Sequence, residues 1–276
     1  MQTTKLLVFV PLEGVLLDSR GRVLPGAEEA AAQLDRHGIP LILVTSGTRA
    51  ETDVPRRTLG HVHPFIAEDG GSVFLPEGYF HLRIPSVVRL GRFLSMPLAR
   101  PLQEASAALR TLAESIGIEV VTFSDMTARE IARNSGMSMQ AAELARQRDS
   151  QEVFFFAGAG EAAIHRFVED ARRSGAQIHR RDPFWRFSLG ADIRAAVSKL
   201  TALYDTARRT GVSTLAASAA VEDTALLKAV HRAVLLPQTA GHFAPELEQA
   251  FPKATRVASP GVAGFHQIVE LLTARD

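Results

Sequence analysis

The sequence contains no cysteine, one tryptophan and two tyrosines among its 276 residues. The absence of cysteine excludes disulfide bonds, thiolate metal sites and a cysteine nucleophile. An excess of charge of one sign is also missing, because 31 Lys and Arg residues face 30 Asp and Glu residues and leave a net charge of +1. Such a balance indicates neither a nucleic-acid partner nor a membrane surface as a partner.

Apolar runs of membrane-spanning length are absent as well, and the first residues show no signal-peptide pattern. The hydrophobic content of 46% and the charged content of 22% are typical of soluble globular proteins. We therefore expect a soluble, cytoplasmic protein that buries a substantial core in one large domain or two smaller ones.

The stretch LLVFVPLEGVLLD, residues 6–18, predicts the central strand of a parallel sheet. A short, unbroken apolar run that ends in a Pro/Gly turn is typical of such a strand. Ligands of open α/β sheets bind beyond the carboxyl ends of the strands, so residues 11–15 are the first place to expect a site. This strand tip offers one ionisable side chain, Glu13, and a proline, Pro11, that has none.

The remaining pattern predicts a divided α/β protein. Helices and strands alternate up to about residue 80, with Pro55 interrupting a helix over 49–59 and residues 68–71 forming a hairpin turn that needs no function. An antiparallel α+β pattern follows up to about residue 190, and the parallel pattern then returns. We predict a Rossmann-like core from residues 1–82 and 190–276, with an inserted α+β cap at 83–189.

Several strings resemble a known family. They are VTSGTRAE at 44–51, PFIAEDGGSVFLPEGYF at 64–80, FSDMTAREIA at 123–132, ARQRD at 145–149 and GAD at 190–192. In this order, and over nearly the whole chain, they are similar to haloacid dehalogenase-like phosphatases with a large cap, and among these to mannosyl-3-phosphoglycerate phosphatases. The resemblance implies the same fold and hydrolysis of a phosphate monoester.

The catalytic positions implied by this resemblance are mostly altered. The family's nucleophilic aspartate falls on Pro11, which has no side-chain oxygen, so no aspartyl phosphate can form there. The acid/base position keeps a carboxylate as Glu13. The family's lysine falls on Ile193 and a metal-binding aspartate on Ala219, which leaves Asp223 as the remaining metal-site carboxylate. Mg²⁺ requires several oxygen ligands, so the resemblance implies a weakened or lost magnesium site.

The positions implied to hold the substrate are better preserved. Thr45 or Ser46 would hydrogen-bond a phosphate oxygen. The cap residues expected to hold the glycerate and sugar parts are Asp125, Thr127, Gln147 and Arg148. Arginine is well suited to bind a carboxylate or a phosphate through two hydrogen bonds.

Alternatives stay open for several of these residues. Glu13 is equally well explained as a solvated turn residue, and Ser46 as part of a helix start. His179, Arg180 and Arg181, together with Arg186, could form either an anion-binding rim or a solvated edge.

Two functional hypotheses follow. The first is an impaired or inactive relative that binds a phosphorylated sugar, a glycerate ligand or a partner protein, with a purely structural subunit as a weaker variant. The second is an active Mg²⁺-dependent sugar-phosphate phosphatase that uses Glu13 and Asp223. The sequence predicts no oligomeric state.

Overall fold

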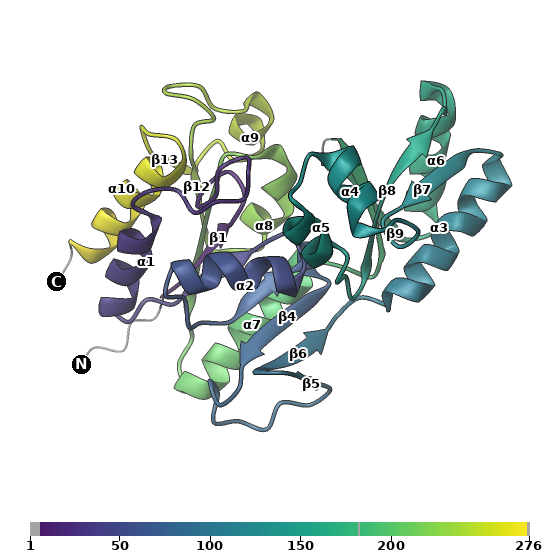
Figure 1. Ribbon diagram of the computed structural model, residues 1–276. Coiled ribbons are helices and arrows are strands. Elements are labelled where there is room, and N and C mark those ends of the chain that lie inside the picture. Colours follow the sequence, from purple (N-terminus) through teal and green to yellow (C-terminus); the bar gives the residue numbers. More distant parts are fainter. Residues whose placement is uncertain (1–5, 182, 275–276) are drawn as a thin grey trace.

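Two β-sheets organise the chain in the computed structural model, which describes residues 6–181 and 183–274. The larger sheet has nine strands in the order β13-β12-β11-β1-β2-β3-β4-β6-β5, and the smaller has four in the order β7-β8-β10-β9. The two sheets lie in two separate lobes of the ribbon diagram (Figure 1). This arrangement confirms the α/β core with an inserted α+β cap.

The large sheet is built around β1 (Leu6–Pro11), which is buried along its whole length. It runs parallel to β2 on one side and to β11 on the other. The other parallel strands of this sheet are β2 (Leu41–Val44), β3 (Phe65–Ala67), β11 (Ser213–Ser218), β12 (Arg232–Leu235) and β13 (Thr255–Arg256). The central position of residues 6–11 is as predicted.

An antiparallel extension completes this sheet beyond β3. Its strands are β4 (Ser72–Pro76), β5 (Val88–Leu90) and β6 (Phe93–Pro97). Strand β6 pairs with β4, so residues 88–97 belong to the large sheet rather than to the cap. The predicted boundary at residues 82 and 83 is therefore too early, because β5 is exposed and shows no apolar pattern in the sequence.

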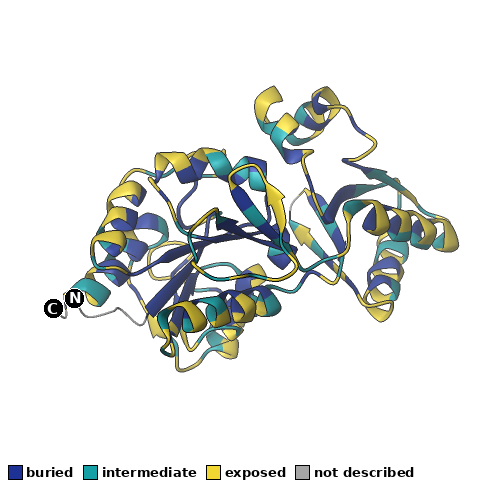
Figure 2. Ribbon diagram, turned by 90° about the horizontal axis from the view of Figure 1, so that it is seen from below, coloured by how far each residue is buried: buried dark blue, intermediate teal, exposed yellow. Residues whose placement is uncertain are grey.

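Helices cover both faces of the large sheet and leave its central strands in the interior (Figure 2). On one face lie α1 (Ala27–Arg36), α2 (Arg49–Thr58) and α10 (Gly261–Thr273). On the other lie α7 (Ile193–Arg208), α8 (Thr224–Lys228) and α9 (Pro245–Ala250). Helix α2 continues through Pro55, contrary to the predicted interruption, and a capping box of Thr48 and Glu51 stabilises its start.

The cap consists of an antiparallel sheet with helices on both faces. Its strands are β7 (Glu119–Thr122), β8 (Gln151–Ala157), β9 (Ala176–Arg181) and β10 (Phe184–Leu189). Helices α3 (Leu102–Ile116) and α6 (Glu161–Arg173) pack on one face, and α4 (Ala128–Ser135) and α5 (Met139–Ala145) on the other.

The second face of the cap sheet is the one that meets the core, since Thr48 of the core donates a hydrogen bond to the backbone oxygen of Leu144 in α5. In the part of the chain that the structure describes, no helix is long and apolar enough to cross a membrane.

Candidate functional site

Three strand ends meet at the carboxyl edge of the large sheet. Pro11 is the last residue of β1 and pairs with Val44 of β2, while Ser218 ends the other neighbouring strand, β11. Because these strands are parallel and adjacent, the residues that follow them lie at one edge. The structure therefore brings the regions of Glu13, Thr45 and Asp223 together, as the parallel-sheet prediction requires.

Glu13 is tied to this edge rather than solvated as a free turn residue. The hydroxyl of Thr45 donates a 2.5 Å hydrogen bond to Glu13 Oε1, and it accepts one from the backbone N–H of Gly47. Thr45 is buried, at 4% exposure. The loop after β2 thus fixes one carboxylate oxygen beside the tip of β1.

Asp223 lies at the end of a short 3₁₀ helix, Val221–Asp223, which follows β11. Its Oδ2 accepts a 2.6 Å hydrogen bond from the hydroxyl of Ser218, and its Oδ1 lies 3.5 Å from Nη2 of Arg181 in the cap. Burial raises the pKa of Asp223 to about 6, although the charge of Arg181 and the Ser218 hydrogen bond act in the opposite direction. A carboxylate of the core is therefore paired with a guanidinium of the cap.

A third core carboxylate enters the site from the turn between β3 and β4. Glu68 and Asp69, in the 3₁₀ turn Glu68–Gly70, both have left-handed backbone conformations, with φ of 52° and 53°. Non-glycine residues adopt this region rarely, and at functional sites more often than elsewhere. Gly70 follows with φ of 95°, and a Cβ there would lie 2.5 Å from the backbone nitrogen of Ile193. This turn was interpreted from the sequence as a plain hairpin, but it forms the junction with the cap.

Asp69 points from this junction into the cap. Its Oδ2 accepts hydrogen bonds from Gln151 Nε2 at 2.8 Å and from His179 Nε2 at 3.1 Å. Arg181 lies 3.8 Å from Oδ1, and Arg186 lies 4.0 Å from Oδ2. Burial opposes ionisation of Asp69, but the His179 contact and the two guanidinium charges outweigh it and hold its pKa below the usual value.

The cap strands present these cations on one face because strand side chains alternate. Ile178 packs in the interior of the cap, so His179 and Arg181 face the opposite way, toward the core. His179 pairs across the sheet with Arg186 of β10. His179, Arg181 and Arg186 thus lie in a cluster at the cleft, whereas Arg180 lies on the opposite face of β9 and is exposed.

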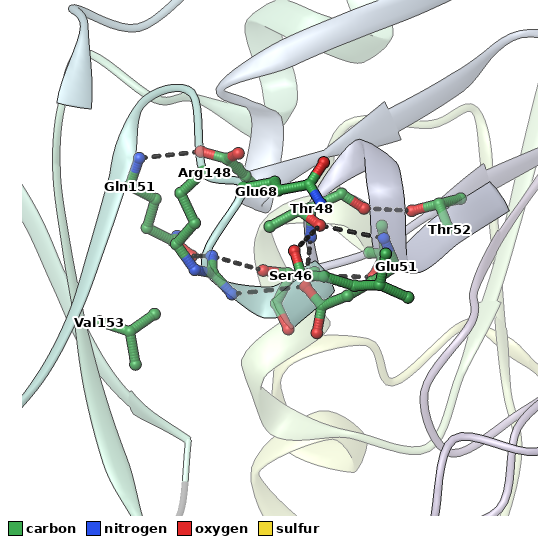
Figure 3. Close-up of polar contacts among 12 residues, drawn as sticks. Ser46, Thr48, Glu51, Thr52, Glu68, Arg148, Gln151 and Val153 are labelled. Atoms are coloured by element: carbon green, nitrogen blue, oxygen red, sulfur yellow. Dashed lines mark hydrogen bonds and ion pairs between the residues drawn. The ribbon is translucent and has the colours of Figure 1, made fainter. Parts of the chain in front are cut away.

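Arg148 supplies a third guanidinium from the loop between α5 and β8 (Figure 3). Its Nη1 donates hydrogen bonds to the backbone oxygen of Ser46 at 3.2 Å and to Oε1 of Gln151 at 2.9 Å, and Glu51 lies 3.8 Å from its Nη2. Arg148 therefore joins the core loop after β2 to the start of β8. Helix α5 ends at Ala145, three residues before Arg148, which leaves this side chain free to cross the cleft.

Three buried donors in this cluster lack partners. The Nε atoms of Arg148, Arg181 and Arg186 make no hydrogen bond to any described residue. Burial, together with the charge of Arg148, lowers the pKa of Arg186 to about 10. Buried polar groups without a partner are rare in native proteins and indicate an occupant such as water, an ion or a ligand. We refer to Arg148, Arg181 and Arg186 as the arginine cluster.

The other predicted cap residues make structural contacts. Asp125 accepts hydrogen bonds from Thr122 and from Arg110, and Thr127 caps α4 in a capping box with Glu130. Gln147 is exposed and contacts the backbone of Glu143. None of these contacts joins them to the arginine cluster, so their role in ligand binding stays a prediction.

The residues present do not fit a magnesium ion. Pro11 and Ala219 offer no side-chain oxygen, and Glu13 and Asp223 are engaged by Thr45, Ser218 and Arg181. Among the described residues, no group of three or more His, Cys, Asp or Glu is placed to hold a metal ion. Mg²⁺ binds through several oxygen ligands in near-octahedral geometry, which this edge of the sheet does not supply.

Sequence reasoning missed Asp69. The two consecutive left-handed residues that aim it into the cleft leave no pattern in the sequence, and its cap partners are 82 to 117 positions away. The one available signal was the EDGG string, which belongs to a segment that resembles the family but reads equally well as an ordinary turn.

Comparison with known proteins identifies relatives over most of the chain. No protein-family model matches it. The chain is 28% identical over 243 residues to the glucosyl-3-phosphoglycerate/mannosyl-3-phosphoglycerate phosphatase of Methanococcoides burtonii, covering 88% of this chain and 89% of the relative. It is 27% identical to the enzyme of the same name from Persephonella marina, over 96% of both chains.

A solved structure shares the fold. A phosphatase of the haloalkanoate (HAD) superfamily from Bacteroides thetaiotaomicron superposes with a TM-score of 0.66 at 17% identity, over 98% of this chain and 96% of the other. The sheet order, the inserted cap and these similarities agree with the resemblance found in the sequence. The chain therefore has the haloacid dehalogenase-like fold and is a homologue of the mannosyl-3-phosphoglycerate phosphatases.

Proposed function

We propose that this protein binds a phosphorylated sugar or glycerate ligand in the cleft between core and cap and that it does not hydrolyse it by the magnesium-dependent route of its relatives. The observation that carries the proposal is the arginine cluster, with its three buried and unpartnered Nε donors above the carboxyl edge of the large sheet. Guanidinium groups are well suited to phosphate and carboxylate oxygens.

The loss of hydrolysis is supported by the tip of β1. Pro11 stands where a nucleophile would attack, and it is buried beside β2 with no group that could form a covalent phosphoenzyme. Glu13 is the nearest carboxylate, but its Oε1 is held by Thr45. A shared fold does not imply a shared reaction, because chemistry depends on the groups at the site.

Binding without turnover can be tested directly. We expect mannosyl-3-phosphoglycerate to raise the melting temperature of the protein, since a ligand that binds only the native state stabilises it. We also expect no phosphate release from this compound or from a generic aryl phosphate in the presence of Mg²⁺. The absence of any thermal shift with phosphorylated sugars and glycerates would contradict the binding proposal. Turnover that Glu13→Gln abolishes would instead establish an active phosphatase.

A further inference from the structure

Arg181 is the last residue of β9 and reaches across the cleft to the core. Its Nη2 lies 3.5 Å from Asp223 Oδ1 and 3.8 Å from Asp69 Oδ1. These two carboxylates come from different core loops, one after β11 and one after β3. One guanidinium therefore bridges two acidic groups that the chain brings together from positions 154 residues apart.

Further carboxylates contribute to this environment. Burial lowers the pKa of Arg181, but the negative charges of Asp69, Glu13, Asp223 and Glu222 outweigh it and raise the pKa above its already high value. The side chain is 22% exposed. Arg181 is thus a permanent positive charge enclosed by the acidic groups at the carboxyl edge of the large sheet.

The position of Arg181 matters because of the carboxylates that surround it. Two of the enclosing carboxylates stand at positions that the family resemblance marks: Glu13 at the acid/base position and Asp223 as the remaining metal-site carboxylate. Without a cation among them, they would repel one another and would repel an anionic ligand. A guanidinium removes that repulsion, although it does not coordinate oxygen atoms as a metal ion does.

Arg181 also keeps a donor available. Its Nε is buried and makes no hydrogen bond to any residue that the structure describes. The two other members of the arginine cluster have the same property, and Arg186 shares the carboxylate of Asp69 with Arg181. The arginine cluster can therefore neutralise the carboxylates and still offer its Nε–H groups to an oxyanion.

We propose that Arg181 is a built-in cation that takes the place of a divalent metal, so that the site binds its phosphorylated ligand without a metal ion. The inference deepens the proposed function, because it concerns the same cleft and the same class of ligand. It assigns Arg181 two tasks, the neutralisation of Glu13, Asp69 and Asp223 and the donation of a hydrogen bond to the ligand. A role as a plain ion-pair clamp between core and cap would include the first task but not the second.

The metal test uses Mn²⁺ as the probe for a divalent site. By electron paramagnetic resonance titration we expect the wild-type protein to show no saturable Mn²⁺ binding. We expect Arg181→Met to gain it, because Glu13, Asp69 and Asp223 lose the positive charge that they share. Arg181→Lys keeps the charge and should still exclude Mn²⁺. Arg180→Met, on the opposite face of β9, is the matched control and should behave as wild type. Saturable Mn²⁺ binding by the wild type that Asp223→Asn abolishes would overturn the proposal.

The ligand test uses inorganic phosphate and mannosyl-3-phosphoglycerate in calorimetric titrations. We expect equal affinities in EDTA and in MgCl₂, and a loss of at least about tenfold in Arg181→Met, the size expected for a hydrogen bond to a charged group. Binding that disappears in EDTA, or wild-type affinity in Arg181→Met, would refute the proposal. Failure of every phosphorylated probe to bind the wild type would instead refute the proposed function, and the Mn²⁺ titrations would still decide the role of Arg181.

Discussion

The hydroxyl of Ser150, in the cap, donates a 2.9 Å hydrogen bond to the carboxylate of Glu68, in the core. The same carboxylate also accepts hydrogen bonds from the backbone N–H groups of Asp149, Ser150 and Gln151, each at 2.8 Å. Glu68 is only 2% exposed. This single side chain therefore anchors the loop that carries Arg148 and the start of β8 to the core.

Replacement of this anchor should loosen the cap. We expect Glu68→Ala to lower the free energy of unfolding by roughly 2 to 4 kcal/mol, because four hydrogen-bond donors lose a charged acceptor in a buried position. Denaturation in guanidinium chloride measures the loss. Glu114→Ala, at an exposed position of α3, is the control and should leave stability within about 0.5 kcal/mol of wild type. An unchanged midpoint for Glu68→Ala would show that the contacts do not stabilise the fold.

Gly70 tests the close approach, within the core, of the turn after β3 to the start of α7. Gly70 has φ of 95°, and a Cβ there would lie 2.5 Å from Ile193 N; Gly117 has φ of 74° but open space around it. Gly117→Ala therefore reports the cost of the left-handed backbone, about 1 to 2 kcal/mol. We expect Gly70→Ala to cost at least about 2 kcal/mol more, because the backbone of residues 192–193 must move. Equal losses in urea denaturation would argue against a tight junction.

His61 should make the protein sensitive to acid. Its Nε2 lies 2.7 Å from the backbone oxygen of Leu41, and its Nδ1 accepts a hydrogen bond from Arg56 Nε, so the buried ring is neutral. Burial, aided by the charge of Arg56, lowers its pKa from 6.5 to about 3. The unfolded state therefore binds a proton first, and the stability that His61 contributes above pH 6.5 is lost as the pH falls toward 3.

The slope of this loss should approach about 1.4 kcal/mol per pH unit below pH 6. Chemical denaturation at pH 7.0, 5.5 and 4.5 measures this slope. The comparison is His61→Gln, in which the part of the pH dependence that comes from His61 should vanish. His165→Gln, whose ring is 75% exposed, serves as the control and should keep the wild-type slope. The same slope in His61→Gln as in wild type would contradict the assignment.

Replacement of Arg186 should affect ligand binding much more than the stability of the fold. It is buried between like charges, so its removal relieves desolvation and repulsion while Asp69 keeps His179 and Arg181 as partners. We expect Arg186→Met to change the free energy of unfolding by no more than about 1 kcal/mol, and to weaken mannosyl-3-phosphoglycerate binding at least about tenfold.

Arg173→Met, at an exposed site of α6, should affect neither quantity. Thermal shift and calorimetric titration provide the two measurements. A large loss of stability together with unchanged binding would mean that Arg186 supports the fold rather than the ligand.

The sequence alone determined the fold and predicted losses at the catalytic positions. The apolar run of β1, the alternation of strands and helices and the family strings identify the sheet and the inserted cap, because hydrophobic periodicity is a local property. Pro11, Ile193 and Ala219 can be recognised as departures from the family without any coordinates, since each is a change of chemistry at a known place in a string.

Only the tertiary structure decided which side chains meet at the carboxyl edge of the large sheet. Asp69 and His179 are 110 positions apart, and Arg181 and Asp223 are 42 apart, so no local pattern joins them. Their meeting depends on the left-handed turn at residues 68–70, on which face of β9 points toward the core and on the orientation of the cap. Packing between the two lobes sets all three. For the same reason the sequence left open whether Arg181 was solvated or buried, whereas the folded chain places it among three carboxylates.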